Sequence, residues 1–397
     1  MEKQNLAKLV SLLIFVVFLT FSCSKDNELE KTEILSDEYF VELSAINEIA
    51  SGIHFPIEGS SSLKSTEQHQ TKSISSIDEI KNSNRKTSFY IVNYNEGGFV
   101  LLSADKRTPP ILGYSFNNNF EVDENSYPPG LRFWMDDAKE QIKAIQLSNI
   151  EQSPKEEIAW DLVQQSLIDE ISSLKYEPPP DCYEHTEIIT VGPIETPPWH
   201  QGYAFNSELP DITCNGYSVK PFVGCLPLAM AMVMRTHEYP TNYNWLSMPF
   251  GYATSTTANF IEELWDAIHD ENSDYPDYDC DGTAVSTSVV DDVFEDHFNY
   301  TNSSTAVYNY NTVKTNIDYD RPVILVGSGG DDCHAWVCDG FRYYLYYDDD
   351  CNMSSSLHFH MNWGWDGYYN AWYVYYNFNP GDYTFNDDKL MIYNIIP

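Results

Sequence analysis

Cys225 is the residue of this sequence that is best placed to act as a nucleophile. It follows Gly224, precedes Pro227 and opens an apolar run over residues 228–234 that predicts a helix. The N-terminus of a helix carries a partial positive charge, which favours the thiolate over the thiol. A glycine before the cysteine would let a substrate backbone approach closely. A small buried cysteine ahead of a core helix explains this segment equally well, so the rest of the chain must decide.

A thiolate nucleophile needs an imidazole partner, a residue that orients the imidazole, and a donor for the oxyanion. His334 is the best placed of the ten histidines, because it lies between a glycine-rich loop and an apolar strand. Asn362 ends another apolar strand and could orient His334, while Trp363 could shield their hydrogen bond from water. Gln201 is the candidate oxyanion donor, together with the backbone N–H of Cys225. A strand-edge histidine and core tryptophans are the alternative interpretation of the same residues.

The candidate residues lie on predicted elements whose order in the sequence is helices first and then an antiparallel sheet. The apolar spacing predicts helices near residues 225–237, 256–270 and 283–298. Short apolar strands follow at residues 322–326, 335–338, 343–347, 357–362, 372–374 and 390–396. Helices first and strands afterwards indicate an α+β domain, which we expect to span residues 199–397.

The first residues of the chain predict export rather than folded structure. Residues 1–22 combine a polar, partly basic start with an apolar stretch that is too short for a confident membrane span. They end in a pattern that resembles a bacterial lipoprotein signal, with Cys23 as the lipidated residue and residues 23–35 as a polar tether. An ordinary signal peptide is the alternative. We therefore expect an outer-membrane or cell-surface lipoprotein, or a protein that is secreted after maturation.

A second α+β region, residues 36–175, precedes the candidate site. Its pattern predicts a helix, a loop, a hairpin, one more strand and two helices, at residues 36–54, 57–88, 89–103, 111–114, 129–147 and 156–174. No residue pattern in this region indicates chemistry. Prolines in residues 176–198 predict an extended, exposed linker, where we expect proteolytic cleavage.

The composition excludes one class of partner and permits disulfides. The formal net charge is −38, so basic side chains are too few to neutralise the phosphates of a nucleic acid. We therefore expect no nucleic-acid partner. An aromatic content of 15% favours a packed globular body over an acidic disordered chain. Export permits disulfides among six further cysteines, whose pairing the sequence leaves open: Cys182, Cys214, Cys280, Cys333, Cys338 and Cys351. Cys338 lies inside an apolar strand, which indicates a buried free thiol.

Two segments raise the possibility of a metal site. Residues 277–282 match the front half of a calcium loop, but position twelve is Ser288 where such a loop has a glutamate. His358 and His360 alternate on one strand without a third ligand at a suitable spacing, so a strand face is the better interpretation. We therefore assign no metal and no cofactor.

The motifs and their order resemble the streptopain-like cysteine peptidases, the C10 family, across almost the full chain. Glutamine, Gly-Cys, histidine and Asn-Trp follow one another in the papain-like order. The matching segments are the pro-segment signature at residues 99–114 and the catalytic segments at 199–206, 224–225, 237–240, 278–283, 321–323, 334–340 and 362–365. Three departures stand out: Cys333 replaces a glycine, Ala204 replaces a proline, and an acidic insertion occupies residues 348–351.

The resemblance implies a papain-like domain and an exported zymogen. Its pro-domain, residues 36–175, would fold against the cleft and inhibit it until it is removed. The substrates would be proteins or peptides, cleaved by an endopeptidase. The alternative is a catalytically silent surface lipoprotein of the same fold that acts as a binding protein. A further possibility is that the N-terminal region inhibits the peptidase even after cleavage.

Overall fold

A single antiparallel sheet joins the N-terminal and C-terminal regions of this protein. The computed structural model describes residues 38–56, 69–163, 185–273, 277–280, 282–329, 332–347, 353–375 and 389–397. The described residues from Val41 onward belong to one compact unit. The predicted signal at residues 1–22, lipidation at Cys23 and the tether at 23–35 lie outside the described residues. Among the described helices, none combines the length and apolar character that a membrane crossing requires.

Eleven strands make up the large sheet. Ten lie in the order β12-β17-β13-β14-β15-β16-β6-β5-β4-β3, and β7 pairs with β14 beside this path. Their bounds are β3 Ile74–Lys81, β4 Thr87–Tyr94, β5 Phe99–Ser103, β6 Ile111–Ser115, β7 His185–Val191, β12 Asn302–Val307, β13 Val323–Gly329, β14 Asp332–Tyr347, β15 Met353–Asn362, β16 Ala371–Tyr373 and β17 Lys389–Ile396. The junction between the two regions is β6 against β16, where Tyr114 pairs with Trp372 and Val374 N–H donates to Leu112 O at 2.8 Å.

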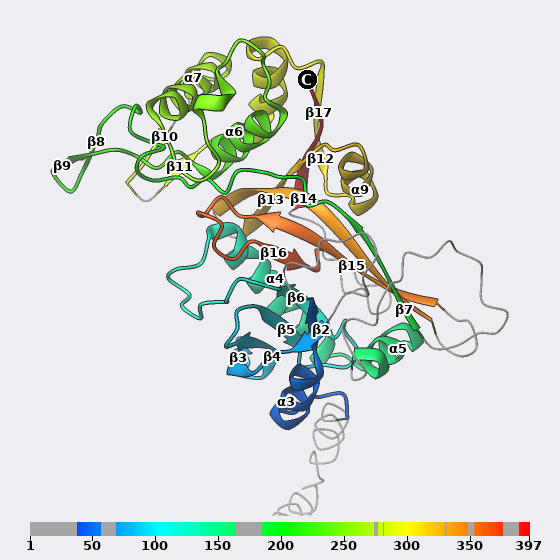
Figure 1. The fold of residues 1–397 in the computed structure, drawn as a ribbon. Coiled ribbons are helices and arrows are strands. Elements are labelled where there is room, and N and C mark those ends of the chain that lie inside the picture. The colour runs from blue at the N-terminus through cyan, green and yellow to red at the C-terminus, as the bar shows by residue number, and fades with distance from the viewer. Residues whose placement is uncertain are drawn as a thin grey trace, which may run out of the picture. The chain divides into compact units, whose positions relative to one another are not determined.

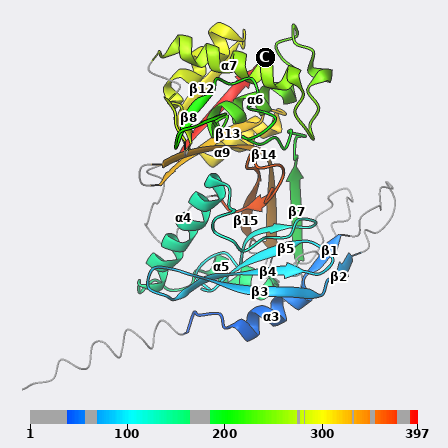
Figure 2. The same ribbon diagram turned by 90° about the vertical axis from the view of Figure 1, so that its left-hand side faces the viewer.

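Where the structure describes the N-terminal region from Val41 onward, its helices are α3 Leu43–Gly52, α4 Pro129–Gln146 and α5 Pro154–Val163. Prolines at the start of α4 suit the first turn, where a missing N–H breaks no helical bond. The buried face of α4 joins one apolar cluster with strands of both regions. Figure 2 shows α4 lying alongside the strands of the sheet.

The C-terminal region carries its helices at the other end of the sheet, where α9 lies apart from α6 and α7 (Figure 1). They are α6 Cys225–His237, η1 Trp245–Ser247, α7 Ser255–Glu271, η2 Thr287–Val289, α8 Val290–Asp292, η3 Val293–His297 and α9 Tyr310–Asp318. A capping box between Thr254 and Thr257 begins α7. Helices α6 and α7 share a second apolar cluster with one face of β13 and β14, including Ala335 and Val337.

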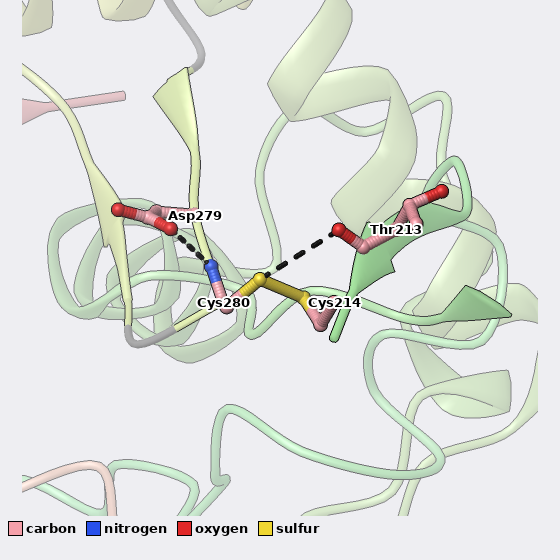
Figure 3. Close-up of a disulfide and its surroundings, with 4 residues drawn as sticks. All are labelled: Thr213, Cys214, Asp279 and Cys280. Atoms are coloured by element: carbon pink, nitrogen blue, oxygen red, sulfur yellow. Dashed lines mark hydrogen bonds between the residues drawn. A yellow bond between two sulfur atoms is a disulfide. The ribbon is translucent and has the colours of Figure 1, made fainter. Parts of the chain in front are cut away.

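Three small hairpins lie outside the large sheet. They are β1 His54–Pro56 with β2 His69–Thr71, β8 Ile212–Cys214 with β9 Tyr217–Val219, and β10 Asp277–Tyr278 with β11 Thr283–Ala284. A disulfide between Cys214 and Cys280 ties the second hairpin to the third (Figure 3). This bridge selects one pairing that the sequence left open, while Cys182 and Cys351 lie outside the described residues.

The α+β prediction is confirmed, and several predicted elements agree closely with the structure. The predicted helices at residues 225–237, 256–270 and 129–147 correspond to α6, α7 and α4. The predicted loop at 57–88 is wrong in part, because it contains the strand β3. Two predicted strands, 335–338 and 343–347, are one long strand, β14. The predicted helix at 283–298 begins later than expected and consists of the short turns η2, α8 and η3.

The segment predicted as a linker, residues 176–198, contains a strand of the large sheet, β7. β7 pairs with the second half of β14, from Phe341 to Tyr347, next to the part of β14 that β13 occupies. Residues 164–184 lie outside the described residues. The C-terminal region is therefore described from His185, fourteen residues before the boundary expected at Trp199.

Candidate active site

The backbone before α6 presents Cys225 at the first position of the helix. Gly224 has a φ of 90°, which residues with a side chain rarely adopt, and a Cβ there would lie 3.0 Å from Thr283 O. No side chain caps this end of the helix. The first N–H groups of a helix have no acceptor within it, so the amide of Cys225 can serve an oxyanion.

Cys225 differs from Cys338, the other described cysteine that is not in a disulfide. Cys338 is fully buried, and burial raises the pKa of its thiol well above its usual value. This confirms the expected buried free thiol. The side chain of Cys225 is half-buried and packs against the apolar cluster of α6 and α7. Of these two thiols, only Cys225 combines access to solvent with a helix N-terminus.

Gln201 is tied to the segment that carries the nucleophile. Val223 N–H donates to Gln201 O at 2.9 Å, two residues before Cys225. Asn206 Nδ2 strengthens the same junction by donating to Pro221 O at 2.8 Å. The side chain of Gln201 is half-buried. The structure therefore holds the predicted oxyanion donor next to the nucleophile segment.

The Asn-Trp-Gly turn after β15 also approaches the first turn of α6. Gly364 has a φ of 67°, and a Cβ there would lie 2.9 Å from Leu228 Cδ2, one helical turn after Cys225. Trp363 is buried and packs on Trp336 with ring centroids 5.2 Å apart. Its indole N–H donates to Tyr369 O at 3.0 Å. Trp363 is therefore held in the apolar cluster that α4 shares with the sheet.

The amide of Asn362 is buried and held on both sides. Its Nδ2 donates to Thr196 Oγ1 at 2.9 Å and to Pro197 O at 3.1 Å. Its Oδ1 accepts from Gly364 N–H at 3.3 Å. Sequence analysis named Asn362 but missed Thr196, because the segment before Trp199 reads as a proline-rich linker.

His334 lies at the start of β14, directly opposite Gly327 of β13. Directly opposite residues of an antiparallel pair present their side chains on the same face. A Cβ at Gly327 would lie 2.3 Å from Phe133 Cε1 of α4, so this face is the one that α4 covers. His334 is half-buried there.

Asn362 leaves the sheet on the opposite face. It pairs with Val337, whose side chain belongs to the apolar cluster of α6. Cys225 packs against the same cluster. The structure thus gathers Cys225, Gln201 and Asn362 around the start of α6, and places His334 on the face of β14 that Phe133 occupies.

The two histidines considered as metal ligands have other partners. His358 is buried, its Nε2 donates to Ile111 O at 3.1 Å, and burial lowers its pKa to about 3. His360 Nδ1 lies 2.6 Å from Asp339 Oδ1. In the part of the chain that the structure describes, no three histidine, cysteine, aspartate or glutamate side chains form a group suited to a metal. Asp281 of the calcium-like segment lies outside that part, and Cys280 is in the disulfide.

Comparisons with known proteins find two family models that match this chain. Residues 199–373 match the model of the Peptidase C10 family, and residues 58–142 match that of the Spi protease inhibitor. The recognition of a streptopain-like cysteine peptidase with a Spi-type N-terminal region is therefore confirmed.

Two curated proteins are similar to this chain, and one of them is named as a thiol protease. The thiol protease/hemagglutinin PrtT of Porphyromonas gingivalis is 25% identical over 334 residues, which cover 74% of this chain and 34% of PrtT. Streptopain of Streptococcus pyogenes is 24% identical over 341 residues, which cover 74% of this chain and 75% of streptopain. The chain thus spans about a third of the length of PrtT.

A solved structure supports the fold of the C10 peptidase together with its N-terminal region. A fragment of prointerpain A from Prevotella intermedia matches with a TM-score of 0.52 at 20% identity. The match covers 81% of this chain and 99% of the fragment. The predicted papain-like α+β fold with a preceding α+β region is confirmed.

Proposed function

We propose that this C10 peptidase is an exported cysteine endopeptidase that is made as a zymogen. Cys225 is the nucleophile, His334 the general acid and base, and Gln201 the oxyanion donor. Asn362 orients His334, and Trp363 shields that pair from water. The observation that carries the proposal is the meeting of Gln201 and the Asn362 turn at the N-terminus of α6, where Cys225 begins the helix.

The reaction follows from this arrangement. The thiolate of Cys225 attacks the carbonyl carbon of the scissile peptide, and the carbonyl oxygen takes the negative charge. The N–H of Cys225 and the side-chain amide of Gln201 stabilise that oxyanion. The imidazolium of His334 gives its proton to the leaving amine as the C–N bond breaks. Water then attacks the thioester while His334 accepts its proton, and the acid product leaves as the thiolate re-forms.

The N-terminal region supports the zymogen proposal through contacts made by α4. Phe133 occupies the space over Gly327, on the face of β14 from which His334 projects. Asp137 of α4 forms an ion pair with Lys389, whose side chain is only 3% exposed. A thiolate–imidazolium pair requires His334 to reach the nucleophile. We infer that α4 must withdraw before the pair can act.

The maturation cut is expected upstream of His185. β7 supplies backbone bonds to β14, and Thr196 and Pro197 supply the acceptors for the amide of Asn362. A cut between His185 and Trp199 would detach these partners from the peptidase. The predicted linker is therefore proposed to carry its cleavage site before residue 185.

Export and anchoring rest on the sequence alone. We propose that residues 1–22 direct export and that Cys23 carries a lipid, which would place the protein on the outer membrane or cell surface. A form secreted after maturation is also consistent with a cut upstream of His185. The substrates are proteins or peptides, and the N-terminal region is an intramolecular partner.

The test compares the soluble wild-type zymogen with Cys225→Ala, without the signal residues, under mild reducing conditions. A protease site engineered between residues 163 and 185 allows both chains to be cut in the same way. The wild type is expected to hydrolyse a denatured protein and to be labelled at Cys225 by a thiol-directed epoxide, as located by mass spectrometry.

Cys225→Ala is expected to fold equally well and to show neither activity nor label at that position. Gln201→Ala should retain the label but lose about a hundredfold or more in kcat, the usual effect of removing one oxyanion donor. Activity that persists in Cys225→Ala would overturn the assignment. A cut wild type whose Cys225 does not react would favour a silent binding protein of the same fold.

A further inference from the structure

The buried amide of Asn362 ends a chain of directional hydrogen bonds that begins at His360. His360 Nδ1 lies 2.6 Å from Asp339 Oδ1. Asp339 Oδ2 accepts the hydroxyl proton of Thr196 at 2.5 Å, and Thr196 Oγ1 accepts from Asn362 Nδ2 at 2.9 Å. Asp339, Thr196 and Asn362 are each at most 9% exposed. Three segments far apart in the sequence therefore meet at one polar core.

A bulge in β14 directs Asp339 into this core. The register between β14 and β15 shifts between Cys338 and Gly340, so that Asp339 is the extra residue. A bulge re-aims a side chain that a regular strand would place elsewhere. The backbone of Asp339 is fixed as well, because Ile194 N–H donates to its carbonyl at 2.8 Å. Asp339 thus holds the segment that carries Thr196 through both its main chain and its side chain.

The donors and acceptors available along this series of hydrogen bonds set its direction. An ionised carboxylate only accepts hydrogen bonds, whereas a threonine hydroxyl can donate one and accept others. Because Thr196 donates to Asp339, the lone pairs of its oxygen are left for an incoming donor. The amide nitrogen of Asn362 is such a donor, and its oxygen is not. Pro197 O, which also only accepts, imposes the same choice.

We propose that Asp339 and Thr196 are positioning residues that fix the amide of Asn362 with its nitrogen toward Thr196 and Pro197, so that its oxygen is the group left to accept from the imidazole of His334 once α4 has withdrawn. An imidazole N–H needs an acceptor, so a flipped amide would present the wrong group to His334. This inference rests on the proposed function, because it assumes that Asn362 orients His334. It assigns a catalytic purpose to Thr196, in the segment between β7 and Trp199.

The test uses variants that keep shape and change hydrogen bonding. Thr196→Val replaces the hydroxyl by a methyl group, and Asp339→Asn offers an amide that can donate to Thr196 and so reverse the chain. Thr196→Ser restores the hydroxyl. Thr190→Val makes the same change on exposed Thr190 of β7, whose Oγ1 accepts from Arg342 at 2.8 Å, away from Asn362. Each variant is made in the full soluble chain, cut upstream of His185, and compared with the wild type.

Two readouts follow the imidazole rather than the fold. The first is kcat and KM against pH on a peptide substrate, and the second is the rate of alkylation of Cys225 against pH. Thr196→Val and Asp339→Asn are expected to lower kcat about tenfold with little change in KM, the effect of losing one ordinary hydrogen bond. The alkaline limb of both profiles should move to lower pH, because an imidazolium without its acceptor loses its proton more readily. Thr196→Ser and Thr190→Val should resemble the wild type.

Combination with Asn362→Ala separates a positioning role from a structural one. If Thr196 acts through Asn362, Thr196→Val should change neither profile further in an Asn362→Ala chain. Additive losses, or a Thr196→Val chain that melts earlier but keeps the wild-type kcat and both profiles, would overturn the inference and leave the proposed function standing. A wild-type chain whose Cys225 is unreactive would instead overturn the proposed function itself.

Discussion

Phe133 of α4 packs so closely over Gly327 of β13 that a methyl group on Gly327 would lie 2.3 Å from its ring. Gly327 is the register partner of His334, so the N-terminal region contacts the sheet directly beside the proposed catalytic histidine. The ring of Phe133 also lies 6.2 Å from that of Trp336, two residues after His334. One side chain of the N-terminal region therefore packs at the start of β14.

Loss of this ring should weaken the docking of α4. Phe133→Ala removes a half-buried aromatic side chain, for which we expect a loss of about 2 kcal/mol. The comparison is made in the Cys225→Ala chain, cut at an engineered site before His185, by following release of the N-terminal fragment. The control is Phe55→Ala, which removes a buried aromatic ring that packs on Tyr94 and Phe116 within the N-terminal region. This control should lower the stability of the N-terminal region without increasing the release of the N-terminal fragment as much as Phe133→Ala does. Equal release of the fragment from both variants would contradict the prediction.

The ion pair between Asp137 and Lys389 should stabilise docking in the same way. Removing one partner strands the other, and Lys389 is the more deeply buried of the two, at 3% exposure against 21%. Asp137→Ala is expected to weaken docking by about 2 to 3 kcal/mol and to leave kcat of the cut, separated peptidase unchanged. Asp136→Ala, on the same helix, breaks only an exposed pair with Lys139 and serves as the control. An equal effect of the two variants would show that general charge, rather than the buried pair, holds α4.

Acid should favour release of the N-terminal region through His358. Its pKa is lowered to about 3, mainly by burial and in part by the charge of Arg342, while the bond to Ile111 O of β6 acts in the opposite direction. The rings of Tyr114 and Tyr344 pack on either side of it. If β6 leaves, the ring can be protonated near its ordinary pKa of about 6.5. Docking should therefore weaken as the pH falls below about 6.5, by up to about 1.4 kcal/mol per unit.

The dissociation of the cut Cys225→Ala chain at pH 7 and at pH 5 measures this effect. His358→Gln keeps a side-chain donor for Ile111 O and cannot take up a proton, so its dissociation should vary less with pH. His269→Gln on α7, where the side chain is exposed, is the matched control and should behave as the wild type. The same pH dependence in His358→Gln would assign the effect to other groups.

The disulfide between Cys214 and Cys280 should stabilise the nucleophile loop. It closes a sequence separation of 66 residues, for which chain entropy predicts up to about 4 kcal/mol. The hairpin of Cys280 also holds that loop directly, since Thr283 Oγ1 donates to Phe222 O at 2.7 Å. The double change Cys214→Ser and Cys280→Ser should lower the free energy of unfolding in urea and make it insensitive to reductant. Peptide mapping without reductant that finds Cys280 unpaired would contradict the assignment.

Local patterns in the sequence were sufficient to predict the elements that carry the candidate site residues. The apolar run after Cys225 and the glycine before it define the start of α6 within a few residues, because helix periodicity and backbone constraints are local. The short apolar runs at residues 335–338 and 357–362 likewise mark parts of the strands that carry His334 and Asn362. Their chemistry could therefore be anticipated without knowledge of the tertiary structure.

Non-local partners could not be anticipated in the same way. Thr196 follows a run of prolines and reads as linker, yet its role depends on Asp339, 143 residues later. β3 carries serines and charges on its exposed positions, so the alternation that marks a strand is weak. The face from which His334 projects depends on its register with β13, which no spacing in the sequence states.

The junction between β6 and β16 has a consequence for the solubility of the mature enzyme. When β6 departs, the backbone groups of β16 that now bond to it lose those partners, and Trp372 loses its neighbour Tyr114. An unpaired strand edge with aromatic side chains is a template for association with another extended chain. The edge is only three residues long, from Ala371 to Tyr373, which limits how far such pairing can extend. The freshly activated peptidase should therefore self-associate weakly and reversibly as its concentration rises, whereas the zymogen, with this edge covered, should remain dispersed.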